Sequence, residues 1–194
     1  MKKRLLCAAL GLAGLVSGTA LAAEGPSDTM LAYTCAGCHG TDGSSVGPAS
    51  PHIASSDPIY FVDTMLAYKK GERQSTIMTR MAKGYTEDQI EQMADWFAKQ
   101  PLVLQKQDAD PAKAARGEAL HEEYCERCHE DGGRDHESGI LAGQWMPWLH
   151  YAMQDFMSGA RYYPRKMESK VQAMVEEHGE GAIDDVIHYY GSQH

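Results

Sequence analysis

After its N-terminal stretch the chain has no uninterrupted run of about 18 apolar residues, the length that a membrane-spanning helix needs. Positive charge is also scarce, because 18 Lys and Arg stand against 27 Asp and Glu, a formal net charge of −9. An acidic chain repels nucleic acid and anionic membrane surfaces. We therefore expect no stable membrane span and no nucleic-acid partner. The charge either attracts basic protein partners or only keeps the chain soluble.

The N-terminal stretch resembles an export signal. Residues 2–4 are basic, residues 5–16 are apolar and uncharged, and the run Ala20-Leu21-Ala22 supplies small residues at positions 20 and 22. This pattern predicts a secretory signal peptide over residues 1–22, cleaved after Ala22, and hence a periplasmic protein. A retained N-terminal anchor is the alternative.

No cysteine is left over for a disulfide or a free thiol. Of five cysteines, Cys7 lies in the predicted signal peptide. The other four are Cys35, Cys38, Cys125 and Cys128. They fall in two copies of C-x-x-C-H, which is the attachment motif of a c-type haem. The sequence therefore predicts two covalently bound haem c groups.

The spacing within the motif explains its chemistry. Two intervening residues place both thiols on one side of a helical turn, within reach of the two vinyl groups of one porphyrin. The adjacent His39 or His129 then points at the iron. A shared zinc site is disfavoured because the pairs lie 90 residues apart. A thioredoxin-like pair would require a βαβ pattern, and short-range structural disulfides would be strained.

The sixth iron ligand decides between electron transfer and ligand binding. Met78 lies 39 residues after His39, and Met167 lies 38 residues after His129, whereas Met81 gives a poorer match of 42. We therefore predict His39 and Met78 for one iron, and His129 and Met167 for the other. Core filling is the interpretation for five other methionines, which are Met81, Met93, Met153, Met157 and Met174.

The chain predicts an all-α fold of two tandem class I cytochrome c domains, each wrapped around one covalent haem. Domain 1 is expected at residues 24–100, a linker at 101–110 and domain 2 at 111–194. Asp57 and Pro58 predict the start of a middle helix in the first half, and Gly71 predicts its end. Thr86 and Gln89 form a capping box before the closing helix. In the second half, helices are expected from Pro147 to Gly159 and from Ile183 to Tyr190.

Several residues distinguish the halves. The region of Pro48 is expected to supply the backbone carbonyl that orients the imidazole of His39, and the second half has no proline there. Trp145 and Trp148 occur only in the second half and are interpreted mainly as packing on the porphyrin. The seven histidines outside the motifs are expected mostly at the surface.

Taken together, the residues resemble the dihaem cytochrome subunit of flavocytochrome c sulfide dehydrogenase. The resemblance lies in residues 35–51, in Ser75-Thr76-Ile77-Met78, in residues 140–145 (Ile-Leu-Ala-Gly-Gln-Trp) and around Met167. It covers nearly all of the predicted mature chain.

The resemblance implies an electron-transfer subunit with no catalytic site of its own. An FAD-containing flavoprotein subunit would oxidise sulfide, and this chain would pass the electrons to a soluble acceptor such as another cytochrome c. FAD is expected only on that partner, because the chain has no G-x-G-x-x-G fingerprint. The alternatives are an independent dihaem shuttle serving a terminal oxidase or other dehydrogenase and, less favoured, a dihaem peroxidase.

Overall fold

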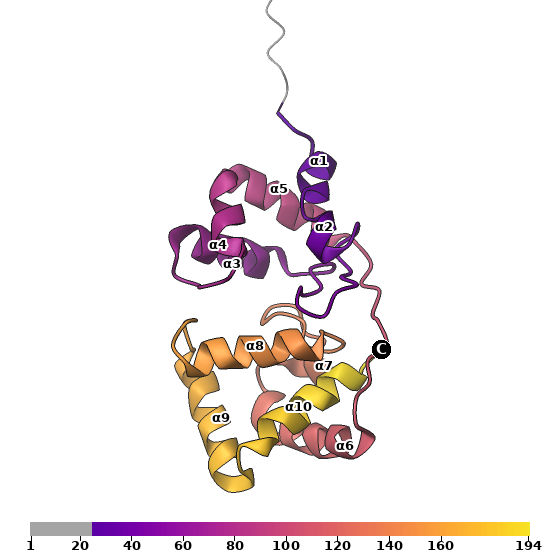
Figure 1. Ribbon diagram of the computed structural model, residues 1–194, viewed down its shortest axis with the longest axis vertical. Coiled ribbons are helices and arrows are strands. Elements are labelled where there is room, and N and C mark those ends of the chain that lie inside the picture. The colour runs from indigo at the N-terminus through magenta and orange to yellow at the C-terminus, as the bar shows by residue number, and fades with distance from the viewer. Residues whose placement is uncertain (1–24) are drawn as a thin grey trace, which may run out of the picture.

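Figure 1 shows the computed structural model, which describes residues 25–194. The predicted signal peptide lies outside the described residues. Within residues 25–194 every regular element is a helix. No helix in this range is long and apolar enough to cross a bilayer. The helices form two halves, stacked one above the other in Figure 1.

The first half contains a short entry helix, a middle helix and a closing helix. Its elements are α1 (Asp28–Tyr33), α2 (Ala36–His39), α3 (Pro58–Lys70), α4 (Met78–Met81), the 3₁₀ turn η1 (Ala82–Gly84) and α5 (Glu87–Ala98). Asp57 caps α3 through the backbone N–H of Tyr60, and Gly71 ends it in the left-handed conformation. Thr86 and Gln89 form the predicted capping box of α5. These helix boundaries are confirmed.

The second half repeats this order with more helix. Its elements are α6 (Pro111–Leu120), the π turn η2 (His121–Cys125), α7 (Glu130–Gly133), α8 (Met146–Met157), α9 (Arg165–His178) and α10 (Gly181–Ser192). The predicted helices around Pro147 and Ile183 correspond to α8 and α10. Helix α9, which carries Met167 in its first turn, was not expected from the sequence.

Each half has its own hydrophobic core. The first is centred on Ile90, Met93 and Phe97, all fully buried. The second is built from α6, η2, α8, α9 and α10. In both halves the closing helix packs on the entry helix, α5 on α1 and α10 on α6, as the aromatic pairs predict. Gly117 permits the closer of these approaches, because a Cβ there would lie 2.1 Å from the carbonyl oxygen of Asp185.

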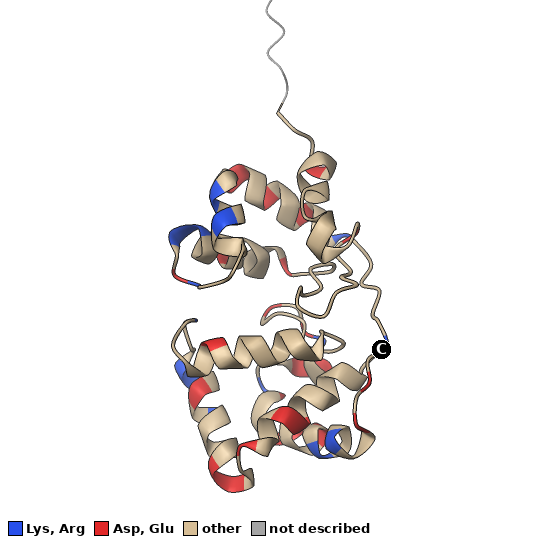
Figure 2. Cartoon of the chain, viewed as in Figure 1, with Lys and Arg blue, Asp and Glu red and all other residues tan. Residues whose placement is uncertain are grey.

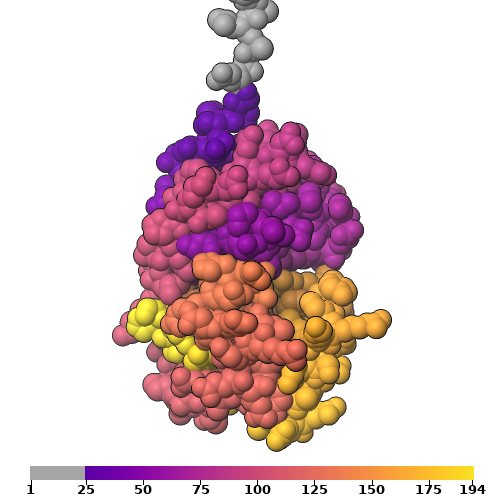
Figure 3. All heavy atoms as spheres, turned by 180° about the vertical axis from the view of Figure 1, so that it is seen from behind, coloured from indigo at the N-terminus to yellow at the C-terminus, as the bar shows by residue number. Residues whose placement is uncertain are grey.

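The halves contact each other through polar groups. The backbone N–H of His52 donates to Gln144 Oε1 at 3.0 Å, and Gln144 Nε2 donates to the carbonyl of His52 at 2.9 Å. Trp145 Nε1 donates to the carbonyl of Ser45 at 3.2 Å. Helix α8, almost free of charged side chains, lies along the second half where it faces the first (Figure 2). Figure 3 shows the two halves in contact from the opposite side.

The segment 101–110 has no helix, but it is bound to both halves. The N–H of Val103 donates to Ser44 Oγ in the first half. Gln107 donates to the carbonyls of Gly143 and Gln144 and accepts from the N–H of Met146. These contacts restrict the movement of the segment that joins the two cores.

Candidate functional site

The two C-x-x-C-H motifs adopt the same backbone turn. The N–H groups of Cys38 and His39 both donate to the carbonyl of Cys35, at 3.2 and 3.0 Å. Cys128 and His129 donate in the same way to Cys125, at 3.1 and 3.0 Å. In each motif the first cysteine is partly buried and the second is exposed. This turn presents two thiols and an imidazole together, which fits covalent attachment of a porphyrin.

The four cysteines are free thiols rather than disulfides. Burial raises the pKa of Cys35, and it raises the pKa of Cys125 to about 11. A catalytic thiol of the thioredoxin type has the opposite property, a pKa lowered by its surroundings. The thiols therefore suit haem attachment better than thiol–disulfide exchange.

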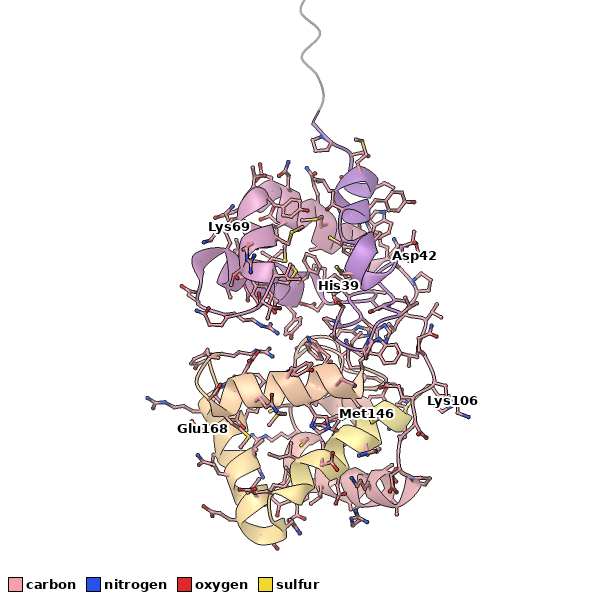
Figure 4. All side chains as sticks on the ribbon, viewed as in Figure 1. His39, Asp42, Lys69, Lys106, Met146 and Glu168 are labelled. Atoms are coloured by element: carbon pink, nitrogen blue, oxygen red, sulfur yellow. The ribbon has the colours of Figure 1, made fainter. Side chains whose placement is uncertain are left out.

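His39 is oriented by a backbone carbonyl. Its ring is 8% exposed, and Nδ1 lies 2.8 Å from the carbonyl oxygen of Pro51. This leaves Nε2 for a metal. Figure 4 labels His39 in the first half. Burial lowers the pKa of His39, so that its imidazole is neutral near pH 7, the form that binds iron. The expectation that the region of Pro48 supplies this carbonyl is wrong, because Pro51, three residues later, does so.

His129 has a different environment. Its Nδ1 is buried and has no hydrogen-bond partner among residues 25–194. Burial lowers the pKa of His129 to about 4, so this imidazole is also neutral near pH 7. The N–H groups of Leu141 and Ala142 donate to the carbonyl of Gly133. In the same way, the N–H groups of Ile53 and Ala54 donate to the carbonyl of Gly43. The loops after the motifs are therefore equivalent in the two halves, and position 139, the equivalent of Pro51, is a glycine.

The predicted methionine ligands lie in corresponding regions. Met78 is partly buried and packs against the first core, whereas Met81 is 43% exposed. This difference favours Met78 over Met81. Met167 is partly buried in the first turn of α9. Core filling is confirmed for Met93 and Met174 and is wrong for Met81 and Met157, which are exposed.

The comparisons with known proteins identify the family of the chain. The family model for cytochrome c matches residues 27–100. The chain is 38% identical over 95 residues to the cytochrome subunit of sulfide dehydrogenase of Chlorobaculum tepidum, covering 43% of this chain and 86% of that relative. It is 30% identical over 167 residues to cytochrome c4 of Pseudomonas aeruginosa, covering 78% of this chain and 79% of that relative. The chain belongs to the cytochrome c family.

The fold agrees with that assignment. The crystal structure of reduced recombinant cytochrome c4 from Pseudomonas stutzeri matches with a TM-score of 0.71 at 24% sequence identity, covering 86% of this chain and 97% of that one. This cytochrome is thus a helical, dihaem electron-transfer protein of the cytochrome c4 type, built from class I cytochrome c folds.

Two histidines of this cytochrome are buried, contrary to the expectation of surface positions. His52 is 5% exposed, and its ring stacks on that of Trp145 at a centroid distance of 6.0 Å. His121 is 1% exposed and hydrogen-bonded at both ring nitrogens. Trp145 therefore joins the two halves, whereas Trp148 packs on the second core. The sequence offered one signal for these contacts. Gln144 and Trp145 belong to the run of residues 140–145, which occurs only in the second half.

Proposed function

We propose that this cytochrome is the electron-transfer subunit of a periplasmic sulfide-oxidising complex. It would accept electrons from a flavoprotein subunit that carries FAD, and pass them to a soluble acceptor such as another cytochrome c. The observation that carries the proposal is the 38% identity to the cytochrome subunit of sulfide dehydrogenase. Residues 75–78 and 140–145, which carry the resemblance to that subunit, support the proposal.

We further propose the roles of the residues at each haem. Cys35 and Cys38 attach the first haem and Cys125 and Cys128 the second. The axial pairs are His39 with Met78, and His129 with Met167. A haem iron with both axial positions filled exchanges single electrons without binding substrate. The polypeptide's contribution is then to orient the imidazoles, exclude water and set the two potentials.

Two guanidinium groups offer a place for haem carboxylates. Arg161 Nη2 lies 3.5 Å from the hydroxyl of Tyr60 across the contact between the halves. Burial, together with the charge of Arg73, lowers the pKa of Arg161. Neither arginine forms an ion pair with a carboxylate of residues 25–194. Partly buried cations are stabilised by counter-charges, and the propionates of the haems would provide them.

Purification from the organism that encodes the chain tests the proposed partner. A tagged copy should retain a flavoprotein at a fixed ratio, identified by peptide masses and by flavin absorbance. Sulfide added to this complex should reduce the haems within the mixing time of a stopped-flow instrument. Sulfide added to the isolated cytochrome should reduce them far more slowly. Loss of the flavoprotein by salt washing, followed by its return, provides the matched control.

The alternative is an independent dihaem shuttle that serves a terminal oxidase or another dehydrogenase. It is favoured by one observation, since the match to cytochrome c4 covers 78% of this chain and the match to the sulfide dehydrogenase subunit covers 43%. A cytochrome that purifies without a flavoprotein, and that sulfide reduces only slowly, would support this alternative.

A further inference from the structure

The second half contains a hydrogen-bonded group of three side chains, the buried His121 and Tyr190 and the partly exposed Glu126, here termed the His121 triad. The Nδ1 atom of His121 lies 2.8 Å from the hydroxyl of Tyr190, and Nε2 lies 2.5 Å from a carboxylate oxygen of Glu126. His121 is 1% exposed and Tyr190 is 4% exposed. Burying polar groups is costly unless they are hydrogen-bonded. The triad satisfies both nitrogens of its imidazole.

The fold does not require these polar residues. Leu31 lies four residues before the first cysteine of its motif, as His121 does in the second half. The residue that follows that cysteine is Ala36 in place of Glu126, and the second member of the closing aromatic pair is Phe97 in place of Tyr190. The first half thus builds the same region from apolar side chains, with Leu31 5% exposed and Phe97 fully buried. The triad is specific to the second haem site.

The backbone is arranged to bring the triad together. Residues His121–Cys125 form a π turn, in which the N–H of Glu126 donates to the carbonyl of His121 at 2.8 Å. Single π turns inside helical segments occur frequently at functional sites. Here the turn leads directly into the haem-attachment motif and places Glu126 beside the imidazole.

The triad runs from solvent to the haem attachment. At its outer end the Glu126 side chain is 43% exposed. At its inner end Tyr190 adjoins Cys125, and burial together with this thiol raises the pKa of Tyr190. The charge of His121 also acts on His129, whose pKa is lowered chiefly by burial and further by His121. The turn that carries His121 thus ends at Cys125, in the same motif as the predicted axial ligand His129.

We propose that His121 is a positioning residue that couples electron transfer at the second haem to a proton, and that the first haem lacks this coupling. When the second iron gives one electron to a one-electron acceptor, His121 releases one proton through Glu126 to water. When the iron regains an electron, His121 takes the proton back. The inference rests on attachment of the second haem at Cys125 and Cys128, which the mass of the mature chain tests separately.

The remaining charged and titratable groups around the triad differ in sign. They are Glu118, Cys125, His129, Arg134, Lys170 and Tyr189. Within the triad, Glu126 is the member that reaches solvent, and its Oε2 contacts His121 and accepts a hydrogen bond from the N–H of Gly132. The hydrogen bond from His121 lowers the pKa of Glu126, so this carboxylate is ionised near neutral pH.

Potentiometry of the intact dihaem protein between pH 5 and 8.5, with small-molecule mediators, tests the proposal without any partner. One midpoint potential should fall as pH rises. At its steepest, the one-electron redox equilibrium constant changes tenfold per pH unit, which corresponds to about 59 mV. The other potential should be nearly independent of pH. His121→Leu, which restores the residue of the first half, should abolish the slope. His150→Gln is the matched control, because it removes another second-half histidine paired with a carboxylate.

Three outcomes would overturn the inference. They are two pH-independent potentials in the wild-type protein, equal slopes at both haems, or a slope that persists in H121L. If H121L fails to fold, Glu126→Gln supplies the test from an exposed position. Loss of the carboxylate should move the pH-dependent range to lower pH, and an unchanged range would contradict the proposal. Met167→His should move the same potential that depends on pH.

Discussion

We expect the contact between the two halves to depend on Gln144. Its side chain is 4% exposed and forms two hydrogen bonds with the peptide groups of His52, at 3.0 and 2.9 Å. Gln144→Ala would leave a buried N–H and a buried carbonyl without partners. Each such group costs about 1–3 kcal/mol, and removal of the buried amide recovers part of this cost. We therefore predict a loss of about 2–4 kcal/mol in the free energy of unfolding.

The same substitution should be felt at the first haem. His52 follows Pro51, whose carbonyl accepts the hydrogen bond from His39 Nδ1 at 2.8 Å. Without Gln144, this peptide loses its anchor and the bond that orients His39 weakens. The potential of the first haem should change, while that of the second should stay constant.

Thermal unfolding of the holo-protein measures the first effect, and for a chain of this size a loss of 1 kcal/mol lowers Tm by about 2–4 °C. Gln92→Ala, at an exposed position of α5, is the control and should leave Tm unchanged. If Q144A melted at the wild-type temperature, with both potentials unaltered, the two hydrogen bonds would not carry the contact and the reasoning would be refuted.

Other predictions concern single groups. Gly117→Ala should destabilise the second half by about 1–3 kcal/mol, because the added Cβ would meet α10. Gly181 has open space around it, so Gly181→Ala should not destabilise the protein in this way. Urea titration of the two variants measures the difference. Asp184 has a lowered pKa, chiefly through a hydrogen bond from Lys113. The Asp184–Lys113 pair therefore stabilises the folded state fully at pH values above the unfolded-state pKa of about 3.9. This stabilisation is lost as pH falls through the folded-state pKa of Asp184. Asp184→Asn should thus lower Tm by a few degrees at most at pH 7, and it should leave Tm unchanged in strong acid. A lower Tm of the variant in strong acid would contradict this reasoning. Met78→His and Met167→His should each remove part of the weak methionine-to-iron absorption band, and an unchanged band would exclude that methionine as a ligand.

Features that depend on local chemistry could be predicted from the sequence. Asp57 and Gly71 bound helix α3 because a carboxylate caps the first turn and a glycine accepts a positive φ. Thr86 and Gln89 cap α5 by bonds between neighbouring residues. The C-x-x-C-H turns belong to the same class, since their chemistry is complete within five residues.

Features that depend on distant contacts could not be predicted. Gln144 binds backbone atoms 92 residues away, and a backbone partner leaves no trace in the sequence. His52 and His121 have polar neighbours, but packing against Trp145 and against α10 buries them. Helix α9 is strongly charged and has one buried residue, Met174, so its apolar period is weak. Pro51 and Pro48 are three residues apart, and only the folded loop shows which carbonyl faces His39.

The unequal imidazoles also predict the direction of electron flow. A bond from His39 Nδ1 to the carbonyl of Pro51 makes that imidazole the stronger donor to iron, which stabilises the oxidised state and lowers the potential. His129 has no such bond among the described residues, so its iron should hold electrons more tightly. Electrons should therefore enter at the first haem and leave from the second, where the His121 triad adds a proton-linked charge. Met78→His should shift the potential of the first haem alone, and this shift identifies that haem in a potentiometric titration. If the first haem had the higher potential in the wild-type protein, the predicted order would be reversed.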